Sequence, residues 1–138
     1  MRLPLLLAAA VTMTAGCGDA REESLPPVPP VLIYRDELPF GDAVSARLTR
    51  ASNAVRDILE PHWGRLEGRI YLLPADARDG FVRQISAHPP AGWTLDPETP
   101  PLPADATLMS YRKKDRIFAF LLVSGVPGEY LPVEILHN

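Results

Sequence analysis

Residues 107–136, TLMSYRKKDRIFAFLLVSGVPGEYLPVEIL, are the stretch that decides the fold of this chain. Runs rich in aliphatic, aromatic and β-branched side chains alternate there with short turns that contain lysine, aspartate, glycine or proline. Such closely spaced runs favour antiparallel neighbours joined by tight turns. The sequence therefore predicts a three-stranded meander, with strands at 107–112, 117–123 and 130–136 and turns at 113–115 and 125–128.

The composition of these strands also predicts their places in the sheet. Residues 118–123 are apolar at every position, so this strand is expected to be central and buried on both faces. Pro132 has no N–H to donate to a ladder, and this places the last strand at an edge of the sheet.

A helix is predicted over residues 41–60, because apolar side chains recur there with helical spacing. Asp42 is the expected N-cap, and Pro61 is expected to stop the helix. The predicted buried face consists of Val44, Leu48, Ala51, Val55 and Ile58.

A strand and a second helix are predicted between this first helix and the meander. Residues 69–73 contain the apolar run of a buried strand, and residues 31–34 are a candidate edge strand. The second helix is expected to start near Asp76 and to end before Pro89. Its predicted buried side chains are Ala77, Phe81, Val82 and Ile85.

These elements predict an α+β fold, with a small, mainly antiparallel sheet and both helices packed on one face. They belong to a single globular domain over residues 31–138, preceded by a signal peptide over 1–16 and a tether over 17–30.

A proline-rich loop interrupts this pattern at residues 89–105, which contain six prolines and Trp93. Long loops without structure of their own are uncommon in compact domains and are usually functional or mobile. Two interpretations are open. Trp93 and Leu95 form an exposed contact for a partner protein, or Trp93 folds back and covers the core.

The first 17 residues have the layout of a secretory signal. Arg2 supplies a positive start, and residues 3–15 are uncharged and mostly apolar. This stretch is shorter than the roughly 20 residues that a spanning helix needs. The segment Thr14-Ala15-Gly16-Cys17 resembles the lipobox of bacterial lipoproteins, with Thr14 where the family has Leu, Val or Ile.

The resemblance implies that Cys17 receives a diacylglyceryl group on sulfur, that the chain is cut after Gly16, and that the new amine is acylated. Several acyl chains make such an attachment effectively permanent. The protein is then expected at the cell membrane or outer membrane, facing the periplasm or the exterior. Plain secretion and an uncleaved leader are the alternatives. Residues 18–30, acidic and then proline-rich, are expected to form an extended tether.

Charge and cysteine content narrow the classes of partner. The whole chain has a net charge of −3, and removal of the leader leaves 13 Lys and Arg against 17 Asp and Glu. The sequence has no basic stripe with interleaved aromatic residues, so nucleic acid is not an expected partner. The single cysteine rules out an internal disulfide, and the domain must depend on its core.

Known catalytic and metal motifs do not occur in the sequence. It contains no Gly-x-Ser-x-Gly, no P-loop and no Gly-x-Gly-x-x-Gly. His62, His88 and His137 lack the spacing of metal ligands. A basic cluster at residues 112–116 is a solvated turn or a contact for anionic lipid or peptidoglycan. No catalytic, cofactor or metal residue is therefore assigned.

The sequence predicts a lipid-anchored binding or accessory module whose partners are the membrane and an envelope or secreted protein. Two alternatives stay open. One is a small envelope hydrolase without a recognisable motif, and the other is a structural subunit of a secretion or envelope complex. Candidate carboxylates for the hydrolase are Asp76, Asp79, Asp96 and Glu98.

Overall fold

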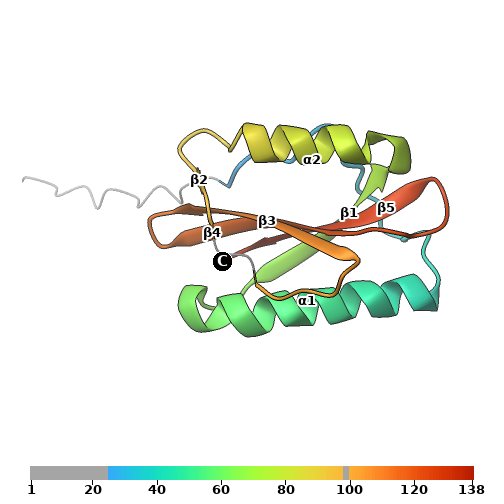
Figure 1. The fold of residues 1–138 in the computed structure, drawn as a ribbon, viewed down its shortest axis with the longest axis horizontal. Helices are drawn as coiled ribbons and strands as arrows, with labels where there is room; N and C mark the ends of the chain where they lie inside the picture. The colour runs from blue at the N-terminus through green and yellow to red at the C-terminus, as the bar shows by residue number, and fades with distance from the viewer. Residues whose placement is uncertain (1–24, 98–99) are drawn as a thin grey trace, which may run out of the picture.

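Within residues 25–97 and 100–138, which the computed structural model describes, five strands form an antiparallel sheet between two α-helices (Figure 1). The strand order is β1-β5-β4-β3-β2. The fold class is α+β, as predicted. In chain order the elements are α1 (Asp42–Trp63), β1 (Glu67–Pro74), the 3-10 turn η1 (Ala75–Ala77), α2 (Arg78–Ala87), β2 (Thr94–Leu95), β3 (Ala106–Lys113), β4 (Arg116–Val123) and β5 (Tyr130–His137).

The predicted C-terminal meander is confirmed. β3 pairs with β4 along its whole length, and β4 pairs with β5. Lys113 pairs with Arg116, so the β3–β4 turn is tight, and Lys114 within it has a φ of 53°. β4 lies at the centre of the sheet, as its unbroken apolar run predicts, and residues 118–123 are each exposed by 2% or less.

β5 is not an edge strand, contrary to the prediction from Pro132, because β1 pairs with its outer side. Pro132 stands opposite Leu72 of β1, whose N–H and C=O both bond Ile33 on the far side. Leu72 and Pro132 are thus a non-hydrogen-bonded pair, in which the N–H and C=O groups of each residue point away from the other strand. The missing N–H of Pro132 therefore faces β4. The β4–β5 ladder ends one pair earlier, at Leu122 and Val133. The missing N–H of Pro132 therefore lies just past the end of the β4–β5 ladder, where the register would otherwise set it opposite Val123.

The two helices cover opposite faces of the sheet, which corrects the prediction that both pack on one face (Figure 1). The physical reason lies in β4, whose alternate side chains are apolar on both faces. Ile117 and Leu121 pack in the cluster under α1, and Phe118 and Phe120 pack in the cluster under α2. Two helices on one face would leave the other apolar set in water, at a cost of roughly 25 cal/mol per Å².

α1 buries the predicted face with a small shift in phase and a different N-terminus. Ile58 is half-buried, and its neighbour Leu59 takes the buried position. The N-cap is Gly41 rather than Asp42, and no side chain caps the helix. Asp42 is instead the first helical residue, where the positive end of the helix dipole still stabilises its carboxylate.

Pro61 does not stop α1, which continues to Trp63. A proline in the last turn removes only the hydrogen bond of its own nitrogen, so two further residues remain helical. The helix ends at Gly64, which has a φ of +82° and donates its N–H to the carbonyl of Glu60 at 2.9 Å. Glycine adopts such a φ without the penalty that other residues meet.

β1 and α2 agree with the prediction. Tyr71, Leu72 and Leu73 of β1 are buried, and α2 buries Phe81 and Ile85. Ala77 and Val82 pack at the edge of the same cluster.

Residues 25–30, which the sequence assigns to the tether, lie against the folded domain, and we call them the strap. Leu25 packs against the apolar cluster on the α2 face of the sheet. At the other end of the strap, Leu32 donates its N–H to the carbonyl of Pro29 at 3.0 Å. The packed part of the chain thus includes residues that the predicted boundary at 31 leaves outside.

Of the predicted edge strand at 31–34, only Ile33 pairs with the sheet. Its N–H donates to the carbonyl of Leu72 at 2.9 Å, and its carbonyl accepts from the N–H of Leu72 at 2.8 Å. This isolated bridge fastens the residues that follow the strap to the outer edge of β1.

A partly buried ion pair connects α1 to β5. The side chain of Glu134 is 9% exposed, and its Oε1 lies 3.4 Å from Nη2 of Arg56. Arg56 also pairs with Glu60 at 3.3 Å and donates to the carbonyl of Leu66. Gly68 on neighbouring β1 makes room for this pair. A Cβ at that position would overlap Oε1 of Glu134 and lie 2.9 Å from Nη2 of Arg56.

Candidate binding pocket

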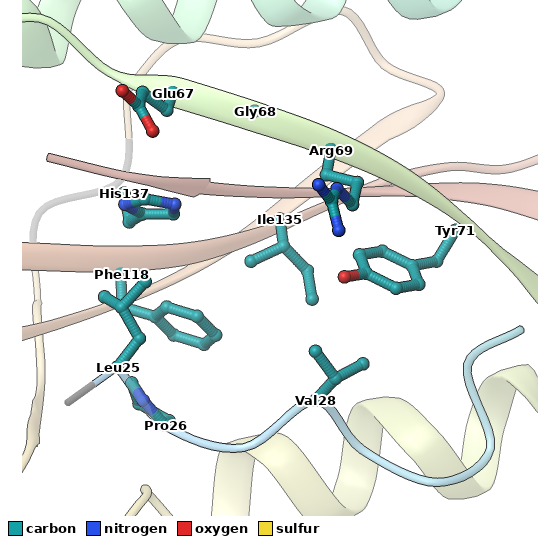
Figure 2. A pocket seen from close by; sticks show the side chains of 10 residues that line it. All are labelled: Leu25, Pro26, Val28, Glu67, Gly68, Arg69, Tyr71, Phe118, Ile135 and His137. Carbon is teal, nitrogen blue, oxygen red and sulfur yellow. The ribbon is translucent and has the colours of Figure 1, made fainter. Parts of the chain in front are cut away.

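A cavity of about 350 Å³ lies between the strap and the sheet, and we call it the strap pocket (Figure 2). Its outer wall is formed by strap side chains, and its floor and rim by β1, β4 and β5. Figure 2 shows the strap running beneath the sheet, with lining side chains that project from both into the space between the strap and the strands. The wall contains Leu25, Pro26 and Val28, the floor Tyr71, Phe118 and Ile135, and the rim Glu67, Arg69 and His137, beside Gly68.

The alternation of side chains along the strands places the floor and rim on one face. Residues 67, 69 and 71 of β1 point to the same side, as residues 135 and 137 of β5 do. The register sets Glu67 directly opposite His137, and His137 opposite Phe118. Arg69 stands opposite Ile135 in the next row. Glu67 and His137 therefore lie together at one end of the pocket, and Arg69 lies one row farther along β1, beside Ile135 of the floor.

Glu67 and Arg69 carry opposite charges at the mouth of the pocket, and both side chains are exposed. In the described part of the chain neither forms an ion pair. The Arg69 guanidinium lies 5.1 Å from the ring centre of Tyr34, which in turn makes an edge contact with Tyr71 at 5.9 Å. Stacking on an aromatic ring orients a guanidinium and leaves its N–H groups available to a ligand.

His137 contributes the one buried polar atom of the pocket that lacks a partner among the described residues. Its Nδ1 is buried and has no hydrogen-bond partner there. The residue as a whole is half-buried. A buried ring nitrogen without a partner costs free energy unless a ligand or water satisfies it. Because this atom is buried, it is not itself open to a ligand, and the features of the pocket that a ligand can reach are its charged rim and its apolar floor.

A second cavity of about 280 Å³ lies between the strap prolines and α2. Its lining is mostly apolar and includes Phe81 and Phe120. The hydroxyl of Tyr111 donates to the carbonyl of Ile85, and burial raises the pKa of Tyr111 to about 12. Because that hydroxyl already joins β3 to the end of α2, this cavity offers less for recognition than the strap pocket does.

Trp93 is placed in the core. It is 7% exposed, and its ring centre lies 6.1 Å from that of Phe118. This placement matches the interpretation in which Trp93 covers the core. The next two residues form β2, which pairs with β3 and gives the loop at 89–105 a short strand. Leu95 is 36% exposed, so of the two candidate contact residues it is the one on the surface. A partner contact at this loop stays a prediction.

The basic cluster at residues 112–116 occupies the β3–β4 turn, as predicted. Lys113, Lys114 and Arg116 each have an interaction partner in the structure. These side chains are therefore accounted for within the fold, and a lipid or peptidoglycan contact there stays a prediction.

Several carboxylates of the described residues take part in structural ion pairs. Asp105 accepts a hydrogen bond from Nε of Arg47 at 2.7 Å, and this bond lowers the pKa of the Asp105 carboxyl. Asp79 pairs with Arg78 at 2.9 Å. Within residues 25–97 and 100–138, no group of three or more His, Cys, Asp or Glu side chains is arranged to hold a metal ion. Of the carboxylates considered for a hydrolase, Glu98 lies outside the described residues, and the hydrolase alternative stays a prediction.

The pocket residues were missed by the sequence analysis, apart from His137, which it considered only as a metal ligand. One signal was present, since Glu67, Arg69 and Tyr71 alternate on one face of a strand whose other residues are small or apolar. The rest depended on the pairing of β1 with β5 and on the course of the strap.

Comparisons of the chain with protein-family models, with curated protein sequences and with solved structures gave no match. The predicted lipidation site Cys17 and the predicted cleavage after Gly16 lie outside the described residues. Among the residues that are described, no helix has the length and apolar character needed to cross a bilayer.

Proposed function

We propose that this protein is a membrane-anchored module of the bacterial cell envelope that binds a small amphipathic ligand in the strap pocket. The anchor is the lipid on Cys17 that the lipobox resemblance implies. The observation that carries the binding role is the cavity of about 350 Å³, with its apolar floor and its unpaired charged rim. A volume of this order is typical of small-molecule sites.

The position of the strap in the chain supports a site close to the membrane. Residues 18–24 separate Cys17 from the strap, and such a segment spans at most about 25 Å when fully extended. The wall of the pocket is thus the direct continuation of the predicted anchor. A ligand at or near the bilayer surface would meet the pocket at short range.

A binding role is favoured over the hydrolase alternative by the chemistry of the rim. Glu67, Arg69 and His137 differ in charge and hydrogen-bonding character, which suits the recognition of several groups on one ligand. Hydrolysis of a glycosidic bond needs two carboxylates facing each other, and Glu67 is the only acidic residue among those that line the pocket in the described chain.

Closing the pocket tests this proposal. In a low-molecular-mass extract of cell envelopes, the full-length wild type in detergent micelles is expected to unfold several degrees higher than in buffer. A ligand at ten times its dissociation constant contributes about 1.4 kcal/mol. Val28→Trp adds a large ring to an exposed strap residue that faces the pocket and is expected to abolish the shift.

Asn53→Trp is the matched control, because it adds the same ring to an exposed position of α1, on the opposite side of the sheet. This variant is expected to keep the full shift. Absence of a shift in the wild type, or an equal shift in Val28→Trp, would contradict the proposed binding role of the pocket.

A further inference from the structure

We infer that the strap pocket takes a short zwitterionic peptide, with its ammonium group at Glu67, its carboxylate at Arg69 and an apolar side chain against the floor. The inference rests on the proposed function and specifies its ligand. Other hollows and charged clusters occur on the described residues, but this pocket joins charges of both signs to an apolar floor.

The spacing of the two charges is the first support. Glu67 and Arg69 are two residues apart on one face of β1, so their Cα atoms are about 6.6 Å apart. The two ends of an extended dipeptide are separated by roughly the same distance, at about 3.3–3.6 Å per residue. A dipeptide can therefore place one charged end at each side chain. In Figure 2 Glu67 lies at the His137 end of the pocket, and Arg69 lies farther along β1.

The apolar surface between the strap and the sheet is the second support. Figure 2 shows Ile135 and Phe118 on the sheet side and Val28 on the strap side of the same space. Ile135 and Phe118 are 5% and 2% exposed, so their packing is fixed by the core. An aliphatic ligand side chain that entered this space would be removed from contact with water. This favours peptides with apolar residues over polar ones.

The rim argues against a simple anion as the ligand. A fatty acid or another plain carboxylate would satisfy Arg69 but would also approach the unpaired carboxylate of Glu67, which repels it. A zwitterion satisfies both groups at once. His137 lies directly opposite Glu67 and lines the same end of the pocket, where the first peptide unit of the ligand would lie.

Capped peptides separate the contributions of the two ends. Isothermal titration calorimetry of the full-length protein in micelles is expected to show that leucyl-leucine binds about tenfold more tightly than its N-acetyl form or its C-terminal amide. A charge-assisted hydrogen bond has roughly this effect. Glu67→Gln should weaken leucyl-leucine about tenfold and leave the N-acetyl form unchanged. Arg69→Gln should weaken leucyl-leucine similarly and leave the amide unchanged.

The exposed residues Glu37 and Arg50 lie outside the pocket, so Glu37→Gln and Arg50→Gln are charge-matched controls that should bind like the wild type. No binding of leucyl-leucine, or equal binding of all three peptides, would overturn the ligand class. That result leaves the proposed function standing if envelope extract still stabilises the wild type but not Val28→Trp. Loss of that stabilisation as well would remove both.

Discussion

Replacement of Arg56 by methionine is expected to lower the free energy of unfolding by about 3 kcal/mol, as measured by urea denaturation at neutral pH. The cause is Glu134, whose carboxylate would remain in the interior without its cation. Glu134 is buried, and its Oε2 already lacks a hydrogen-bond partner among the described residues. Arg56 supplies the neighbouring positive charge at 3.4 Å. Methionine keeps much of the apolar stem of arginine, so the loss reports the polar contacts of Arg56 with Glu134, Glu60 and the carbonyl of Leu66 rather than its packing.

A double-mutant cycle with Glu134→Leu isolates the pair. Leucine at 134 removes the stranded carboxylate, and the Arg56→Met, Glu134→Leu double variant is expected to lie within about 1 kcal/mol of the wild type. The coupling between the two sites should then be about 2 kcal/mol or more. If the single Arg56→Met change costs less than the double change, the carboxylate is not held by Arg56, and this description of the α1–β5 contact is wrong.

Truncation of Phe120 to alanine is expected to cost about 3–5 kcal/mol, because a large buried ring leaves a cavity that the surroundings fill only in part. Phe120 is 2% exposed at the centre of the sheet. Its ring makes edge contacts with Phe81 of α2 at 5.5 Å, with Tyr111 of β3 at 6.2 Å and with Phe118 at 5.1 Å. This one side chain therefore joins α2, β3 and β4. A loss of this size is a large fraction of the stability of an ordinary domain.

Phe40→Ala is the matched control, since Phe40 is only partly buried at the edge of the α1 cluster. Its loss in the same denaturation experiment is expected to be less than half that of Phe120→Ala. Equal losses would mean that the aromatic cluster under α2 has no special part in the stability of the fold.

Local sequence patterns predicted the elements of this fold well. The apolar run at 118–123 made β4 the central strand, and the helical spacing from Val44 to Val55 identified the buried face of α1. These predictions succeeded because each depends on side chains that are close together in the chain. The ends of α1 were less predictable, because Asp42 and Pro61 are compatible with more than one position in a helix.

The arrangement of the elements depended on contacts between distant residues, and there the predictions failed. Pro132 suggested an edge strand, but the prediction did not foresee that β1 would pair with the outer side of β5 while the β4 ladder ended before the proline. The same apolar run that places β4 at the centre also requires cover on both faces, which two helices on one face do not provide. An unbroken apolar strand is thus evidence for two covering layers.

The candidate site was the least predictable part of the molecule. Its rim alternates along β1, its floor comes from β4 and β5, and its wall comes from residues that were assigned to the tether. A proline-rich segment after a signal is typical of a spacer, and no local pattern distinguishes a spacer from a strap that packs on its own domain. The apolar residues here contact the domain: Leu25 and Val28 line the pocket, and Leu32 is buried.

The mass of the N-terminal peptide, measured on protein isolated from its own membranes, tests the proposed anchor most directly. The account predicts a peptide that begins at residue 17, with a diacylglyceryl group on sulfur and an acyl chain on the amine. An unmodified thiol at that position, or a peptide that still begins with the initiator methionine, would contradict the membrane anchor and the location proposed for the pocket.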